Sequence, residues 1–126
     1  MEKKILVVDD NKSILKIVKH WLSDEGYNVD VTRFPKQVLE MAKGRAYNLI
    51  ILDIMMEEMN GFEVLENLRA NKETEDVPVM IITAITLYKN IASEARAMFN
   101  DFLAKPFHKD ELLEKVRHAL TAHSGV

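Results

Sequence analysis

The sequence predicts an α/β domain in which five strands alternate with five helices. Three short, continuous apolar runs, at residues 4–8, 49–52 and 77–83, are typical of strands that are buried on both faces of a sheet. Segments with apolar residues at helical spacing separate these runs, and the 126 residues contain no linker or internal repeat. Strands that alternate with helices over one domain length indicate a parallel sheet with helices on both faces.

The first half of the chain contains two predicted strand–helix units. The run KILVV at residues 4–8 forms the first strand, and Gly26 suits the C-terminal end of the helix that follows. Residues 27–34, YNVDVTRF, alternate apolar with polar side chains, so the second strand is expected to be half exposed. Pro35 fits the first turn of the next, short helix. The apolar faces of the two helices consist of Ile14, Val18, Trp21 and Leu22 in the first, and of Val38, Leu39 and Ala42 in the second.

The second half of the chain continues this alternation. The predicted elements are, in order, a strand at 49–52, a helix opened by Gly61, a strand at 77–83, a weaker helix from about Leu87 to Met98, a strand at 101–104 and a final helix with Leu112, Leu113, Val116, Ala119 and Leu120 on its apolar face. The continuous runs place the first, third and fourth strands in the centre of the sheet, and the half-exposed second strand belongs at an edge. The strand order is therefore predicted as 2-1-3-4-5, and the fold as a flavodoxin-like (βα)5 three-layer sandwich.

The composition excludes several classes of protein. The formal net charge of −3 gives no reason to expect nucleic acid as a direct ligand. The absence of cysteine excludes disulfides and thiolate metal sites, so any metal must use oxygen or histidine ligands. The N-terminal apolar run is too short for a signal peptide, and no stretch approaches the ~20 apolar residues of a membrane span. A cytoplasmic protein without membrane contact is therefore expected.

Polar side chains follow the predicted strands at their carboxyl ends. They are Asp9 and Asp10 after the first strand, Asp53 after the third, Thr83 after the fourth and Lys105 after the fifth. Each of these residues alone would usually be a solvated loop residue or a helix cap. In an open parallel sheet, however, the carboxyl ends of adjacent strands meet at one edge, and ligands bind there. Three carboxylates, a hydroxyl and an ammonium at this edge therefore predict a functional site.

The chemistry of such a site follows from its charges. Carboxylates held a few ångströms apart repel one another, and a cation that joins them relieves this repulsion. Mg²⁺, or Mn²⁺ in its place, takes oxygen ligands and keeps waters that a phosphate can replace. One carboxylate can then act as a nucleophile for a phosphoryl group, whose oxygens need a metal, a cation and a hydrogen-bond donor. Lys105 and Thr83 can supply the last two.

The motifs VVDD, LIILD, IITA and FLAKPF, in this order and spacing, resemble the receiver domain of two-component response regulators. The resemblance is to stand-alone, single-domain receivers of the chemotaxis type, and it implies a receiver domain at residues 1–122 with a C-terminal tail at 123–126. It implies a signalling domain that catalyses its own phosphorylation and dephosphorylation rather than a turnover enzyme. The phosphoryl donor would be a sensor histidine kinase, a phosphotransfer protein or a small phosphodonor.

The resemblance also implies a role for each residue at the predicted site. Asp53 would be the phosphoacceptor. Asp10 and Asp53 would ligate Mg²⁺ through their side chains. Met55 would contribute its backbone carbonyl to the metal, and Asp9 would act through a water.

The remaining implied roles concern the phosphoryl group and the output signal. Thr83 would donate a hydrogen bond to a phosphoryl oxygen, Lys105 would pair with its charge, and the Lys105–Pro106 peptide bond would be cis. On phosphorylation Thr83 would move toward the phosphoryl group and the ring of Phe102 would turn inward, unless Phe102 is simply a core residue. An output partner or output domain would then dock on the face made by the fourth helix, the fifth strand and the last helix.

The sequence departs from the family pattern in the loop after the phosphoacceptor. Glu57 stands where receivers usually carry proline, and Glu58 follows it. These acids either favour metal and slow an anionic donor, or they lie in a solvated loop. Met55 and Ile85 are bulky and apolar at positions that flank the path of hydrolytic water in this family, which predicts a slowly hydrolysing aspartyl phosphate.

A second departure lies at the end of the fourth helix, where Met98 and Phe99 replace the usual Gly-Ala. A glycine at this point would end the helix in the left-handed conformation, which costs other residues on the order of 1–2 kcal/mol. The helix end is therefore expected either to differ or to carry strain. Phe99 is expected either to contact a partner or to pack into the core.

Three other functions compete with the prediction of a phosphorylated receiver. Aspartate-nucleophile phosphohydrolases carry a second acid two residues after the nucleophile, where this chain has Met55. A flavodoxin-like cofactor binder would need a Gly-, Ser- or Thr-rich loop after the first strand, where this chain has DDNKS. A receiver-like interaction module that acts without phosphorylation stays open as the alternative.

Overall fold

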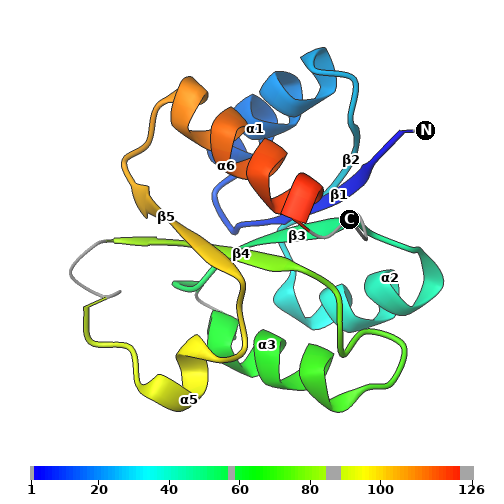
Figure 1. Ribbon diagram of the computed structural model, residues 1–126, viewed down its shortest axis with the longest axis vertical. Helices are drawn as coiled ribbons and strands as arrows, with labels where there is room; N and C mark the ends of the chain where they lie inside the picture. The colour runs from blue at the N-terminus through cyan, green and yellow to red at the C-terminus, as the bar shows by residue number, and fades with distance from the viewer. Residues whose placement is uncertain (1, 57–58, 85–88, 123–126) are drawn as a thin grey trace.

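The computed structural model describes residues 2–56, 59–84 and 89–122, and it confirms the predicted sheet. Five parallel strands lie in the order β2-β1-β3-β4-β5. The strands are β1 (Lys4–Val8), β2 (Asn28–Thr32), β3 (Leu49–Asp53), β4 (Val79–Ala84) and β5 (Asp101–Lys105). Helices α1 (Lys12–Asp24) and α6 (Lys109–Ala122) cover one face of the sheet (Figure 1). The other face carries the short helix η1 (Pro35–Gln37) and helices α2 (Val38–Gly44), α3 (Gly61–Ala70) and α5 (Ser93–Arg96).

Alternate side chains of the central strands fill two apolar clusters, one on each face of the sheet. In β1, Ile5 and Val7 pack with α1 and α6, whereas Leu6 and Val8 pack on the side of α2 and α3. All residues of β3 are buried. Because burying one such side chain stabilises the fold by about 1.5–3 kcal/mol, these strands are firmly held, and so are the residues at their ends.

The edge strand and the elements around it also follow the predictions. In β2, Val29 is buried and Val31 is partly exposed, so the strand is half exposed as predicted, but burial does not alternate strictly because Thr32 is buried as well. Gly26 adopts a positive φ of 91° just after α1, a conformation that glycine reaches without strain. Pro35 occupies the first turn of η1.

Helix α3 begins directly against the end of β3, and only glycine permits this contact. The backbone N–H of Gly61 donates to the carbonyl of Ile54 at 2.9 Å. A Cβ added at Gly61 would lie 2.7 Å from Ile54 Cα and 2.9 Å from the carbonyl oxygen of Asp53. Asn60 caps the helix by accepting a hydrogen bond from the N–H of Glu63 at 3.1 Å. The close packing of α3 thus constrains the chain that leaves β3.

The predicted fourth helix is wrong in its extent. Residues 87–88 lie outside the described part of the chain, and residues 89–92 are not helical. Helix α5 spans only Ser93–Arg96 and contains no buried residue. Helices this short depend on tertiary packing for their stability, and here Ile91, which precedes the helix, is the side chain that is buried.

The end of α5 differs from the glycine-containing pattern, and it carries no strain of the left-handed kind. No residue other than glycine has a positive φ in the described parts of the chain. The N–H of Met98 donates to the carbonyl of Ala95 at 3.0 Å, and the carbonyl of Met98 accepts a hydrogen bond from Arg69 Nε at 2.9 Å. Phe99 is partly buried and packs against the apolar cluster on the α3 side, as the core alternative predicts. Within the described residues, no helix is long and apolar enough to cross a membrane.

Candidate functional site

The three predicted carboxylates lie together at the carboxyl ends of β1 and β3. One carboxylate oxygen from each of Asp9, Asp10 and Asp53 lies within 4.8 Å of the other two. Asp9 is 1% exposed and Asp53 is 3% exposed, whereas Asp10 is partly exposed. Two of the three charges are therefore almost completely removed from water, which is costly unless a cation accompanies them.

Lys105, at the end of β5, provides one such cation. Its Nζ lies 3.2 Å from Asp9 Oδ2 and 3.2 Å from Asp53 Oδ2, so a single ammonium bridges both buried acids. The second oxygen of each acid accepts a backbone hydrogen bond. The N–H of Asn11 donates to Asp9 Oδ1 at 2.9 Å, and the N–H of Met55 donates to Asp53 Oδ1 at 3.0 Å. Each carboxylate is thereby oriented at both of its oxygens.

Burial and charge change the pKa values of this cluster. Burial raises the pKa of Asp53 from 3.8 to about 6, and the nearby Asp9 charge adds to this rise, while Lys105 and the N–H of Met55 oppose it. For Lys105, burial alone would lower the pKa, but the charges of Asp53 and Asp9 outweigh it and raise the pKa above its usual value. Lys105 is therefore an ammonium at neutral pH, and Asp53 is an acid whose charge is poorly compensated by the protein alone.

Thr83 contributes a buried hydroxyl that forms no hydrogen bond with the part of the chain that the structure describes. It is 1% exposed near the end of β4, the strand that pairs with β3, and its neighbour Ile82 is in register with Asp53. Among the described residues, no group forms a hydrogen bond with Thr83 Oγ1. A buried hydroxyl without a hydrogen bond costs roughly 1–3 kcal/mol, so the site is incomplete as the protein alone forms it. A ligand with oxygen acceptors would satisfy this group.

The family model of the response regulator receiver domain matches residues 5–117. The chain belongs to this family. Among its relatives, the transcriptional regulatory protein HprR of Escherichia coli is 38% identical over 123 residues, which cover 98% of this chain and 54% of that protein. The response regulator ArlR of Staphylococcus saprophyticus is 36% identical over 118 residues, which cover 93% of this chain and 52% of that protein. The receiver domain thus spans about half the length of these curated relatives.

Solved structures agree with this assignment. The chemotaxis response regulator CheY4 of Vibrio cholerae matches with a TM-score of 0.86 at 29% identity, covering 94% of this chain and 99% of that chain. The receiver domain of the sensor histidine kinase PA1611 from Pseudomonas aeruginosa matches with a TM-score of 0.85 at 26% identity, covering 96% of this chain and 99% of that chain. The latter structure has a magnesium ion coordinated in its active site cleft. The predicted flavodoxin-like fold and the predicted family are confirmed.

The other predicted site residues of the receiver domain are placed as follows. The Lys105–Pro106 peptide bond is cis. The ring of Phe102 is partly buried, with Lys115 Nζ 5.4 Å from its centroid, so Phe102 is not a fully buried core residue. The side chain of Met55 is 65% exposed next to Asp53. Three residues named above, Glu57, Glu58 and Ile85, lie outside the described part of the chain.

An apolar groove next to Lys105 was not predicted from the sequence. It has a volume of about 380 Å³, and helix α1 and the segment after β5 line it with Ile14, Ile17, Trp21, Pro106 and Phe107. Ile17 is 45% exposed, which is unusual for isoleucine. Ile14, Ile17 and Trp21 lie three and four residues apart and share one side of α1, although only Ile14 and Trp21 belong to the apolar face predicted for this helix. Ile17 is an apolar residue outside the predicted apolar face, and this is the sequence signal that could have revealed the groove.

Proposed function

We propose that this receiver domain accepts a phosphoryl group on Asp53 and thereby switches the binding of a partner or output domain. The observation that supports this proposal most strongly is the position of Lys105 between Asp53 and Asp9, on the strand that pairs with the one carrying Thr83, whose hydroxyl forms no hydrogen bond with the described residues. An ammonium and a hydroxyl donor at one carboxylate are the groups that a transferred phosphoryl group needs. A carboxylate oxygen of Asp53 attacks phosphorus while the bond from phosphorus to the donor breaks, and the donor leaves with its electron pair.

The residues present also fit a divalent metal ion. Asp9, Asp10 and Asp53 offer hard oxygen ligands within 4.8 Å of one another, and Mg²⁺ or Mn²⁺ would suit them. Asp10 and Asp53 would ligate directly, Asp9 would act through water, and Met55 would add its backbone carbonyl. When bound, the metal neutralises charge on the phosphoryl oxygens. A cation held by these residues would favour the charged form of Asp53, which is the nucleophile.

The donor would be a sensor histidine kinase or a phosphotransfer protein in the cytoplasm. The apolar groove formed by Ile14, Ile17, Trp21, Pro106 and Phe107 is continuous with the site, because Lys105 also lines it. A donor protein that packs on this groove would bring a phosphohistidine within reach of Asp53. The exposed Ile17 is the side chain that such a contact would cover.

The output signal would leave through Thr83 and Phe102 to the face formed by α5, β5 and α6. The ring of Phe102 is partly buried, and we expect it to change its packing when Thr83 Oγ1 bonds a phosphoryl oxygen. The exposed Met55 would hinder hydrolytic water at the acyl phosphate, which supports a long-lived phosphorylated state. The partner at this face would be either a separate protein or an attached domain. HprR and ArlR are about twice as long as this chain.

Phosphorylation with acetyl phosphate and Mg²⁺, followed by intact-protein mass spectrometry, tests the proposal. We expect a mass gain of one phosphoryl group in the wild type and none in Asp53→Asn. Lys105→Met should lower the rate of phosphorylation by at least about tenfold, whereas Lys72→Met, an exposed lysine of the α3–β4 connection, should leave it unchanged. A wild type that gains no mass with the metal present would instead favour an interaction module that acts without phosphorylation.

A further inference from the structure

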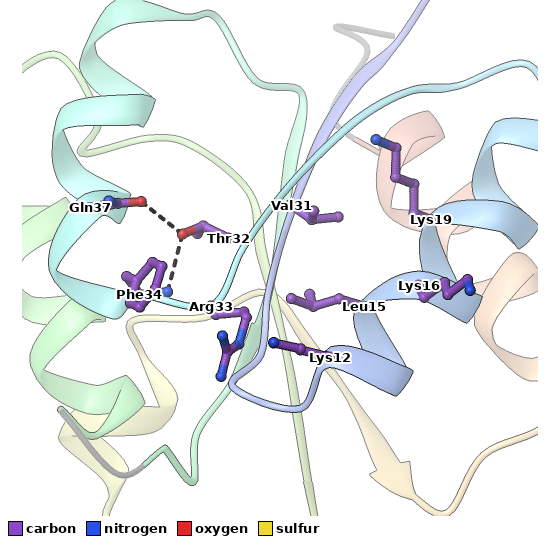
Figure 2. Close-up of a pocket in the computed structure, with 9 residues that line it drawn as sticks. All are labelled: Lys12, Leu15, Lys16, Lys19, Val31, Thr32, Arg33, Phe34 and Gln37. Atoms are coloured by element: carbon purple, nitrogen blue, oxygen red, sulfur yellow. Dashed lines mark hydrogen bonds between the residues drawn. The ribbon is translucent and has the colours of Figure 1, made fainter.

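A second groove lies on the other side of helix α1 from Lys105, between α1 and the end of β2 (Figure 2). It has a volume of about 430 Å³, and four cations line it: Lys12, Lys16, Lys19 and Arg33. The three lysines recur at helical spacing and form one stripe along α1, while the apolar groove near Lys105 takes the opposite face of that helix. The two grooves are therefore separate surfaces.

The cations of this basic groove form no ion pair with the described residues. Among the residues that the structure describes, no carboxylate forms an ion pair with Lys12, Lys16, Lys19 or Arg33, although ion pairs form elsewhere on the surface. Arg33 lies over the ring of Phe34, with its guanidinium carbon 5.7 Å from the ring centroid. In a chain with a net charge of −3, such a concentration of uncompensated positive charge is a local feature, not a reflection of composition.

Apolar side chains lie between these cations. Leu15 and Val31 line the groove, and Phe34 is 46% exposed although Arg33 lies over its ring. The strand that contributes Val31 is also an edge strand of the sheet, with no neighbour on its outer side among the described residues. An edge strand of this kind can receive an extended peptide through backbone hydrogen bonds.

The form of the groove favours a peptide over a small anion or a duplex. The buried hydroxyl of Thr32 already donates to Gln37 Oε1 at 3.1 Å and accepts from the N–H of Phe34 at 3.1 Å (Figure 2). Its hydrogen atom is therefore not available to bind a small anion. A duplex, with one charge per ~1.7 Å, would need basic residues over a wider surface than one groove. Lysines four residues apart on a helix are separated by about 6 Å, close to the ~6.8 Å between alternate side chains of an extended peptide.

We propose that this basic groove binds an acidic peptide segment of a partner protein. Carboxylates of the segment would pair with Lys12, Lys16, Lys19 and Arg33, and an apolar side chain of the segment would cover Phe34. Because the groove lies on the other side of α1 from Lys105, this binding is independent of phosphoryl transfer at Asp53. The surface would give the receiver a second partner, or a second contact with the same partner, selected by charge.

Fluorescence anisotropy with a short labelled peptide of repeated Glu-Glu-Leu tests the proposal. We expect binding to the wild type that weakens with added salt, and at least about tenfold weaker binding to Lys16→Glu/Lys19→Glu and to Phe34→Ala. The conservative Lys16→Arg/Lys19→Arg variant should retain binding. The matched control Lys72→Glu/Lys89→Glu changes two exposed lysines outside the groove by the same charge and should bind like the wild type.

Several results would overturn the proposal. These are no binding at physiological salt, equal weakening in the Lys72→Glu/Lys89→Glu control, or equal binding of a Gln-Gln-Leu peptide. Tighter binding of a DNA duplex through the same lysines, or salt-sensitive self-association in sedimentation, would assign the groove to another occupant. Acetyl phosphate labelling of Lys16→Glu/Lys19→Glu should match the wild type, so a failure of peptide binding and a failure of phosphorylation are distinguished.

Discussion

The carboxylate cluster and the segment around α5 differ sharply in how the fold holds them. Asp9 and Asp53 extend from β1 and β3, whose side chains are almost all buried, and each is bonded to a backbone N–H and to Lys105. Helix α5 is four residues long, buries none of them, and its end is held through Arg69. The chemical end of the domain is therefore fixed before any ligand binds, whereas the α5 face is packed lightly enough to move.

The largest loss of stability is expected at the contact between α3 and the end of β3, where the fold holds the site most tightly. Gly61→Ala should destabilise the protein by about 3 kcal/mol, because the new Cβ would lie 2.7 Å from a backbone atom of Ile54 that cannot move aside. The matched control is Gly44→Ala, where a Cβ would meet no atom within 4 Å, and its effect should stay within about 1 kcal/mol. Urea unfolding measures both. Equal stability of the two variants would show that the contact of α3 with β3 is not rigid.

The next largest loss of stability is expected when the hydrogen bonds of Arg69 that hold the end of α5 are removed. Arg69 donates to the carbonyls of Met98, Glu75 and Val77 at 2.9, 3.0 and 2.7 Å. Arg69→Met should cost about 2 kcal/mol and should speed hydrogen exchange in residues 93–100 more than in β1 or β3. Arg117→Met, at an exposed position of α6, serves as the control and should change stability by less than about 0.5 kcal/mol. Uniform exchange changes across the sheet would contradict the contrast between the two regions.

In metal-free protein, Asp53→Asn is expected to change the free energy of unfolding by a smaller amount, and in the stabilising direction. Burial and the charge of Asp9 raise the pKa of Asp53 to about 6 from 3.8, so between these values the folded protein holds a proton that the unfolded chain has lost. The stability of the wild type relative to Asp53→Asn should therefore fall as the pH rises from about 4 to about 6, and then stay constant. Above that range the variant should be more stable, because it lacks the buried charge of Asp53. The difference should be on the order of 1 kcal/mol, since solvent screens part of the interaction.

Thermal unfolding of both proteins between pH 4 and pH 8 in a chelator checks this pH dependence. Added Mg²⁺ should raise the melting temperature of the wild type more than that of Asp53→Asn, since the metal neutralises the same charge. A wild type that gains stability over the variant as the pH rises would contradict the assigned cause of the pKa shift.

The smallest effect is expected within α5 itself. Ala95→Gly should cost less than about 1 kcal/mol, because a helix without buried residues contributes little to global stability. Hydrogen exchange near Asp53 should stay unchanged in this variant. A loss above about 2 kcal/mol, measured by urea unfolding, would show that α5 is part of the cooperative core.

The same contrast explains how much the sequence could predict. Continuous apolar runs are typical of strands that are buried on both faces, so the positions of Asp9, Asp53 and Thr83 near strand ends followed from the runs before them. The bridge of Lys105 between two acids depends on tertiary distances, which no local pattern contains. The extent of α5 could not be predicted because its helical spacing rests on small side chains that pack weakly. Arg69 lies in the helix that Gly61 opens, and its hydrogen bonds to the carbonyls of Met98 and Val77 depend on tertiary distances that no local pattern contains.

The central claim is that Asp53 is the residue that becomes phosphorylated, and its most direct test locates the phosphoryl group on the chain. Borohydride reduces an acyl phosphate, so a phosphorylated aspartate is recovered as homoserine in peptide mass spectrometry. After treatment with acetyl phosphate and Mg²⁺, we predict homoserine at position 53, and none when a chelator replaces the metal. Homoserine at Asp9 or Asp10 instead, or at no aspartate in a sample with the metal present, would contradict the account.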